Sequence, residues 1–218
     1  MSLHQMTILF QGDSITDGGR RRNEEASPEL GYSYPSVIAE QISAARSDQM
    51  PAIINRGISG NRVSDLYARW NEDAISLKPD LISILIGVND LWRIMNNLPE
   101  GATDRFERAY RHLLDETREV LPNAALVLME PFILNVGAPA EKWDAWHEGI
   151  SKYHRIVREL AAEYKTSFVP LQAAFEQAAQ SGGPAEWLRD GVHPTEAGHR
   201  LIAEQWLSVV RSSGIANI

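Results

Sequence analysis

The 218-residue sequence contains no cysteine, which excludes disulfides, thiolate metal sites and cysteine nucleophiles. It also has no apolar run near the roughly 18–20 residues that a membrane-spanning helix requires. Its first residues lack the basic start and the long apolar stretch of a signal peptide. We therefore expect a cytoplasmic protein that does not enter a membrane.

A concentrated positive charge is absent as well. The chain has 29 acidic and 21 basic side chains, a formal net charge of −8, and its basic residues are scattered apart from the run Arg20–Arg22. Nucleic acid and anionic lipid would both need a strong positive field, so neither is an expected partner. The 44% apolar and 23% charged residues are typical of a soluble globular protein, and the length suits one domain over residues 1–218.

Short apolar segments alternate along the chain with longer segments of helical period, a pattern typical of a parallel sheet covered on both faces. We therefore predict an α/β fold, a single-domain three-layer sandwich with a five-stranded parallel sheet and helices on both faces. The predicted strands are residues 6–10, 52–55, 81–86, 125–129 and 167–169, and the predicted helices are residues 35–46, 63–77, 103–120, 143–165 and 195–211, with a helical turn near 171–180.

Ligands of such sheets bind beyond the carboxyl ends of the strands, so the loops at those ends are where a site is expected. These loops are residues 12–19, 56–61, 87–92, 130–139 and 189–193.

The first of these loops contains a candidate nucleophile. Residues 12–17 read GDSITD directly after a predicted strand. A serine hydroxyl there, beside a helix N-terminus, would be exposed to substrate and aided by the local dipole, which favours Ser14 as a nucleophile. The alternative is that Ser14 or Asp13 merely caps a helix. A phosphate-binding loop is disfavoured, because the glycines lack the required spacing and Asp13 and Asp17 would repel phosphate.

A candidate base and its orienting group stand near the other end of the chain. Asp190 precedes His193 by three residues on a loop that Pro194 restrains. Such a carboxylate can reach Nδ1 of the imidazole and hold the tautomer that leaves Nε2 as a proton acceptor. For an isolated pair, a turn at Asp190 and simple packing of His193 at a helix start would be the better interpretation.

Two further loops carry donors for a developing negative charge. The side-chain amide of Asn89 follows an apolar strand, and Gly60 offers a backbone N–H that no side chain obstructs. Together with the Ser14 N–H, they would form a three-donor oxyanion hole. Ordinary turn formation is the alternative for each loop.

These blocks, taken in order, resemble the four motif blocks of the SGNH (GDSL) hydrolase superfamily. The matching residues are Gly12–Ser14, Gly60, Gly87–Asp90 and Asp190–His193, and the one departure is Ile15 where the name-giving pattern has leucine. The resemblance implies a flavodoxin-like SGNH fold. It assigns Ser14 as nucleophile and first oxyanion donor, Gly60 and Asn89 as the other donors, Asp190 as orienter and His193 as base.

A narrower resemblance, to acetylxylan esterases and related carbohydrate deacetylases, lies in residues 12–17, 57–61, 69–70 and 86–93. It implies a serine esterase that removes acetyl groups from carbohydrate esters, such as acetylated xylo-oligosaccharides, through an acyl-enzyme. The resemblance also suggests a possible homo-oligomer, and the acyl-enzyme mechanism needs no cofactor. No metal is expected, because no carboxylate or third histidine joins His147 and His154 at metal-ligand spacing. Trp92 and Trp187 flank two of the motif blocks and would line the acyl or sugar pocket, with core packing as the alternative.

Two rival functions stay open from the sequence. A lysophospholipase or thioesterase on the same scaffold would need a long apolar acyl channel, which the loops do not provide. A carbohydrate-binding relative without activity would explain the tryptophans but not the combined nucleophile, base and donors. The remaining histidines are assigned mostly to surface or helix packing; they are His4, His112, His147, His154 and His199.

Overall fold

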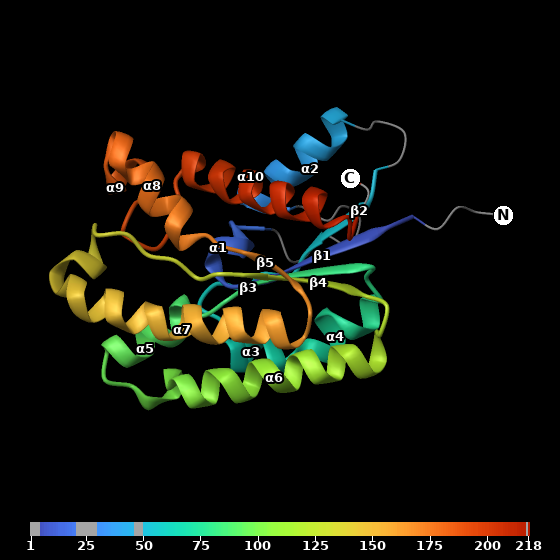
Figure 1. Ribbon diagram of the computed structural model, residues 1–218, viewed down its shortest axis with the longest axis horizontal. Helices are drawn as coiled ribbons and strands as arrows, with labels where there is room; N and C mark the ends of the chain where they lie inside the picture. The colour runs from blue at the N-terminus through green and yellow to red at the C-terminus, as the bar shows by residue number, and fades with distance from the viewer. Residues whose placement is uncertain (1–4, 21–29, 46–49, 217) are drawn as a thin grey trace.

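The predicted apolar strands form one parallel sheet in the order β2-β1-β3-β4-β5, as the computed structural model shows for residues 5–20, 30–45, 50–216 and 218 (Figure 1). The strands are β1 (Thr7–Gly12), β2 (Ala52–Asn55), β3 (Leu81–Leu85), β4 (Ala125–Met129) and β5 (Ser167–Val169). This is the strand order of flavodoxin-like sheets. The predicted α/β sandwich with a five-stranded parallel sheet is therefore confirmed.

Helices cover both faces of the sheet, which explains why the central strands are apolar throughout. Every residue of β3 is buried, as expected for a parallel strand that faces helices on both sides. One face carries α2 (Tyr34–Ala45), α8 (Gln172–Gly182), α9 (Pro184–Trp187) and α10 (Glu196–Ser213), and the other carries α3 (Val63–Ala68), α5 (Val88–Met95), α6 (Thr103–Val120) and α7 (Trp143–Glu163) (Figure 1).

The predicted helix 63–77 is wrong as a single helix. It divides into α3, α4 (Trp70–Asp73) and a 3-10 turn at Ile75–Leu77. The breaks fall at Arg69 and Ala74, whose backbones leave the helical region. Trp70 is buried, and its Nε1 donates to Thr117 Oγ1 of α6 at 2.9 Å. This contact fixes α4 against α6 and explains why packing overrides a continuous helical period here.

The predicted loop 87–92 is also wrong, because α5 begins at Val88 immediately after β3. Gly87 turns the chain between strand and helix with a φ of 131°, a value that suits glycine. Val88 and Leu91 are buried in the core. Asn89 therefore lies in the first turn of a helix rather than in a loop.

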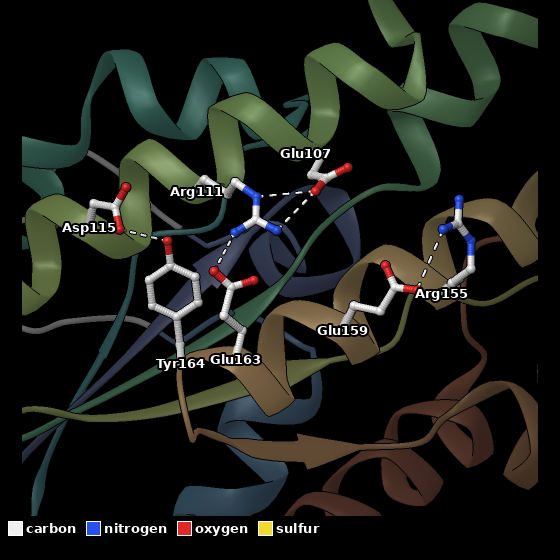
Figure 2. A network of polar contacts seen from close by, with 7 residues as sticks. All are labelled: Glu107, Arg111, Asp115, Arg155, Glu159, Glu163 and Tyr164. Carbon is white, nitrogen blue, oxygen red and sulfur yellow. Dashed lines mark hydrogen bonds and ion pairs between the residues drawn. The ribbon is translucent and has the colours of Figure 1, made fainter.

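A polar network joins α6 to α7 on the outer face of the molecule (Figure 2). Arg111 of α6 contacts Glu107 one turn earlier at 3.0 Å and Glu163 of α7 at 2.7 Å. The hydroxyl of Tyr164 donates to Asp115 at 2.6 Å. Exposed ion pairs of this kind contribute about 0–1 kcal/mol each, so the network sets the register of the two helices more than it adds stability.

Some sequence predictions fall outside the described residues: His4, Arg21 and Arg22 of the basic run, and Arg46 at the end of the predicted helix 35–46. Across the ranges that are described, every helix is either too short or too polar to serve as a membrane span.

Candidate active site

The candidate residues gather where the strand order reverses. β1 has β2 on one side and β3 on the other, so the loops after β1 and β3 lead to opposite faces of the sheet and leave a crevice at their carboxyl ends. Ser14 follows β1, Asn89 follows β3, and Gly60 lies in the loop after β2. The segment that carries Asp190 and His193 reaches the same edge just before α10.

A tight turn from strand to helix holds Ser14. Ser14 is the first residue of the short helix α1 (Ser14–Asp17), and the Asp13 Oδ1 caps this helix by accepting from the Ile15 N–H at 3.0 Å. A Cβ on Gly12 would lie 2.3 Å from Thr16 Oγ1 and 2.5 Å from a main-chain oxygen of β3, so glycine is required there. The capping alternative from the sequence thus applies to Asp13 and leaves the Ser14 hydroxyl for other contacts.

Ser14, His193 and Asp190 form one continuous row of hydrogen bonds. The Ser14 Oγ lies 2.9 Å from His193 Nε2, and His193 Nδ1 lies 2.7 Å from Asp190 Oδ2. The other oxygen of Asp190 accepts from the backbone N–H of His193 at 2.8 Å and of Val192 at 3.0 Å. Partial burial on its own would raise the pKa of Asp190. These hydrogen bonds outweigh that effect and lower the pKa, which keeps the carboxyl ionised.

Two backbone hydrogen bonds hold the Asp190–His193 segment in place. The Arg189 N–H donates to the His193 carbonyl at 2.9 Å, which closes the segment on itself, and Leu134 N–H donates to the Gly191 carbonyl at 3.0 Å. Gly191 has a φ of 90°, and a Cβ there would lie 2.2 Å from the Val136 carbonyl oxygen. Close packing against the loop after β4 therefore fixes the position of the imidazole.

The two remaining donor candidates lie in loops that touch each other. Asn89 Nδ2 donates to the Asn61 carbonyl at 3.0 Å, directly after Gly60. An amide has two N–H groups, so this bond leaves one for a ligand. Gly60 has a φ of 81°, and a Cβ there would have no atom within 4 Å, which means that the surface beside it is open.

Two side chains that the sequence analysis did not single out hold the Gly60 loop against α1. Asp17 Oδ2 accepts from the Ser59 N–H at 2.9 Å and from its hydroxyl at 3.1 Å. Asn55, buried at the end of β2, donates to the Thr16 carbonyl at 2.7 Å. Asp17 belongs to the GDSITD segment, so its presence was visible in sequence, whereas its partner lies 42 residues away.

Two buried carboxyl groups lie beside the site. Burial raises the pKa of Asp13 to about 7, against the lowering effects of the Ile15 N–H and of the charge on His193. Burial also raises the pKa of Asp90 to about 8, against the Val63 N–H and Arg62, while the charge of Asp13 adds to the rise. The Oδ2 of Asp13 is buried and has no hydrogen-bond partner within the described residues.

A cavity of about 450 Å³ opens next to the Ser14–His193 pair. Its lining residues are Ser14, Ile15, Gly18, Tyr32, Arg189, His193, Pro194 and His199. His199, assigned in sequence to surface or helix packing, thus also lines this cavity. Within the described ranges, no three His, Asp or Glu side chains cluster closely enough to hold a metal ion.

The structure does not bring the two predicted pocket tryptophans to this cavity. Trp92 packs edge-on against Trp146, with ring centroids 5.0 Å apart. Trp187 lines a separate cavity together with Thr195 and Leu201. Both tryptophans are half-buried, and Tyr32 is the aromatic residue that lines the cavity beside Ser14.

Comparisons with known proteins agree with this arrangement. A model of the GDSL-like lipase/acylhydrolase family matches residues 10–201. The acetylxylan esterase of Geobacillus stearothermophilus is 37% identical over 207 residues, which cover 92% of this chain and 91% of that protein. The crystal structure of a protein from Parabacteroides merdae, assigned as a GDSL-like lipase, is 40% identical with a TM-score of 0.88 over 97% of both chains.

A catalytic mutant of the Geobacillus esterase, in which a serine is replaced by alanine, is 35% identical to this chain with a TM-score of 0.85 over 96% of both chains. Other catalytic mutants of the same esterase replace an aspartate or a histidine by alanine.

Proposed function

This chain belongs to the GDSL-like lipase/acylhydrolase family and is a carboxylic ester hydrolase, and we propose that it removes acetyl groups from acetylated xylo-oligosaccharides. The observation that carries the proposal is the hydrogen-bonded row Ser14–His193–Asp190 at 2.9 Å and 2.7 Å. The likeness to the Geobacillus acetylxylan esterase supports the substrate class. Its serine, aspartate and histidine catalytic mutants support the same three residue types here.

In the proposed mechanism, Ser14 Oγ attacks the acyl carbon while its proton passes to His193 Nε2. Asp190 holds the imidazole through Nδ1 and stabilises the imidazolium that forms. The tetrahedral intermediate then collapses, the ester C–O bond breaks, and His193 returns the proton to the leaving sugar hydroxyl. Water repeats the sequence on the acyl-enzyme and releases acetate, with no cofactor in any step.

The Ser14 N–H, the Gly60 N–H and the second amide N–H of Asn89 act in this mechanism as donors to the oxyanion. The contact of Asn89 with Asn61 supports the assignment, because it joins two of the three donor loops at 3.0 Å before substrate binds. Donors that are fixed in advance need no reorganisation when the negative charge develops.

The composition of the cavity does not suit a long lipid chain. Among its described lining residues only Ile15 and Pro194 are apolar, and the rest are polar, aromatic or glycine. A lysophospholipase would need a long aliphatic channel. We also retain a homo-oligomeric assembly and a cytoplasmic location as predictions from the sequence; light scattering tests the first and cell fractionation the second.

The experiment measures kcat/KM for acetyl, butyryl and octanoyl esters of one alcohol, together with acetylated xylo-oligosaccharides. One methylene in a close-fitting acyl pocket changes specificity by about 1–3 kcal/mol, so acetyl should lead butyryl by a graded margin and octanoyl should fall further. Ser14→Ala is the inactive control. Preference for octanoyl, or acetylated sugars reacting no faster than simple acetates, would reject the carbohydrate substrate while leaving ester hydrolysis intact.

A covalent serine probe separates the enzyme from a carbohydrate-binding relative. The intact protein should be labelled and Ser14→Ala should not be. Labelling that is absent from the intact protein, or that persists in Ser14→Ala, would favour the binding protein.

A further inference from the structure

The cavity beside Ser14 contains one permanently charged side chain, that of Arg189, among its described lining residues. The backbone N–H of Arg189 closes the segment that carries His193. Its guanidinium, however, makes no hydrogen bond or ion pair with any residue that the structure describes. Several other arginines of this acidic chain are paired, for example Arg62 with Asp65 at 3.0 Å and Arg69 with Asp73 at 2.7 Å.

His199 of α10 provides a neutral polar wall to the same cavity. Its residue surface is 9% exposed, and its Nδ1 is buried with no partner within the described residues. Burial, together with the charges of Arg189 and His193, lowers the pKa of His199 to about 4. At neutral pH the ring is therefore an uncharged imidazole, with one N–H donor and one acceptor nitrogen.

Tyr32 contributes a flat apolar face at the mouth of the cavity. The residue is 84% exposed, which is unusual for a large aromatic side chain in this protein, and its backbone N–H is anchored to the Gly18 carbonyl at 2.8 Å. An exposed ring next to polar groups is suited to stack on the face of a sugar ring. The cavity thus combines an aromatic face suited to a sugar ring, a neutral hydrogen-bonding group and a cation that has no partner among the described residues.

We propose that this cavity is a subsite for an acidic sugar unit, in which Arg189 binds the carboxylate of a uronic acid attached to the acetylated oligosaccharide. The proposal rests on the proposed function, because the subsite would bind the sugar part of the substrate, which leaves when the acetyl ester is cleaved. His199 then hydrogen-bonds a hydroxyl of that unit, and Tyr32 stacks on its ring.

The charge balance of the cavity favours a carboxylate over a neutral unit. The guanidinium of Arg189 presents parallel N–H donors that fit both oxygens of a carboxylate. The two carboxyl groups beside the catalytic row do not pair with it: Asp190 is engaged by His193 at 2.7 Å, and Asp13 is buried. The net charge of −8 repels an anionic substrate at long range, and a local positive contact would offset that repulsion.

The test compares two matched acetylated xylo-oligosaccharides, one neutral and one bearing a single glucuronic acid. The intact enzyme should show a kcat/KM that is up to roughly fivefold higher for the acidic substrate, as expected for one ion pair at an exposed site. Arg189→Met keeps an unbranched stem but removes the guanidinium and its charge, and it should bring the ratio close to one. Raising the salt concentration should also shrink the ratio, because the contact is electrostatic.

Arg200→Met is the matched control. Arg200 is a neighbouring exposed arginine that pairs with Glu196 and lines the separate cavity with Trp187. This variant should keep the preference for the acidic substrate. A ratio near one in the intact enzyme, or a preference that survives Arg189→Met, would overturn the proposal even though the acetyl ester is hydrolysed.

A binding measurement keeps the subsite testable apart from the reaction. Calorimetry with Ser14→Ala compares xylotriose with xylotriose carrying one glucuronic acid, neither of them acetylated. Tighter binding of the acidic sugar that disappears in Ser14→Ala combined with Arg189→Met supports the subsite, whatever ester the enzyme prefers. Equal binding of the two sugars rejects it, whereas failure of the proposed function would show as loss of ester hydrolysis alone.

Discussion

Asp90 is a buried carboxyl group in the first turn of α5, and its ionisation predicts a measurable dependence of stability on pH. The residue is 2% exposed, and its Oδ2 accepts from the Val63 N–H at 3.3 Å. Burial raises its pKa to about 8, whereas the same group in an unfolded chain titrates near 3.8. Between these values the folded protein holds a proton that the unfolded chain releases.

The sign follows from proton binding. Stability falls with pH wherever the folded state binds more protons than the unfolded state, so the contribution of Asp90 is complete below the unfolded pKa and is lost as pH rises towards the folded pKa. Each pH unit in that window costs about 1.4 kcal/mol, so roughly 3 kcal/mol of the free energy of unfolding should be lost between pH 5 and pH 7. Asp90→Asn carries no charge at either pH and should lack this loss.

Urea unfolding, followed by tryptophan fluorescence at pH 5 and pH 7 in the same salt, measures the effect. The difference in unfolding free energy between Asp90→Asn and the intact protein should move by roughly 3 kcal/mol in favour of the variant over that interval. Any fixed cost of the amide cancels in this comparison. Asp104→Asn is the control, because Arg108 lowers the pKa of that exposed carboxyl and it stays ionised throughout. Parallel pH profiles for Asp90→Asn and the intact protein would refute the buried, protonated carboxyl.

The remaining predictions concern turnover of acetyl esters. Ser14→Ala and His193→Ala should each abolish most of kcat, and the double variant should be little worse, because the groups act as a unit; additive losses would argue against this unit. Asp190→Asn should lower kcat on the order of 10⁴-fold, since the amide favours the wrong imidazole tautomer; stopped-flow rates near those of the intact enzyme would exclude that role. Asn89→Ala should cost roughly 10²–10³ in kcat, the usual loss for one oxyanion donor, and unchanged kcat would remove Asn89 from the site.

The sheet could be predicted from the sequence because buried parallel strands carry their signal locally. The runs at Ala52–Asn55 and Ala125–Met129 have the same bounds in the prediction and in the structure. The order of the strands cannot be predicted in this way, because the local pattern of apolar residues does not indicate which strand lies beside β1. The resemblance of the motif blocks implied a flavodoxin-like fold, and the observed order β2-β1-β3-β4-β5 is the order of such sheets.

The start of α5 shows why local signals failed near the site. The segment 87–92 follows a predicted strand and contains Asn89 and Asp90, which favour turns, so the local sequence favours a loop there. In the structure, Val88 and Leu91 anchor the segment in the core, and the buried Asp90 accepts a backbone N–H from α3. Tertiary packing therefore outweighed turn propensity at the position where the helix presents Asn89.

Tyr32, Arg189 and His199 could not be predicted individually as cavity residues, because separate segments of the chain contribute them. Tyr32, Arg189 and His199 carry no motif, and each has an ordinary interpretation as a surface or packing residue. Arg189 directly precedes Asp190, yet the sequence alone does not show whether an arginine in a loop forms an ion pair within the described part of the protein. The reacting groups could be predicted because they lie in sequence motifs. The other residues that line the cavity could not, because their positions depend on how the chain folds.

The site residues are held mostly by bonds to backbone rather than to one another. Asp13 binds the Ile15 N–H, Asp17 binds the Ser59 N–H, and Asn89 binds the Asn61 carbonyl, each at 2.9–3.0 Å. Bonds of this kind form as the loops fold, so the geometry around the serine exists before any substrate arrives. The arrangement has a cost, because one carboxyl oxygen of Asp13 caps the helix while Oδ2 is enclosed and finds no hydrogen-bond partner in the part of the chain that the structure describes. A solvent-exposed capping residue would not leave a buried oxygen without a hydrogen bond. It would, however, restrain the strand-to-helix turn before Ser14 less than a buried one.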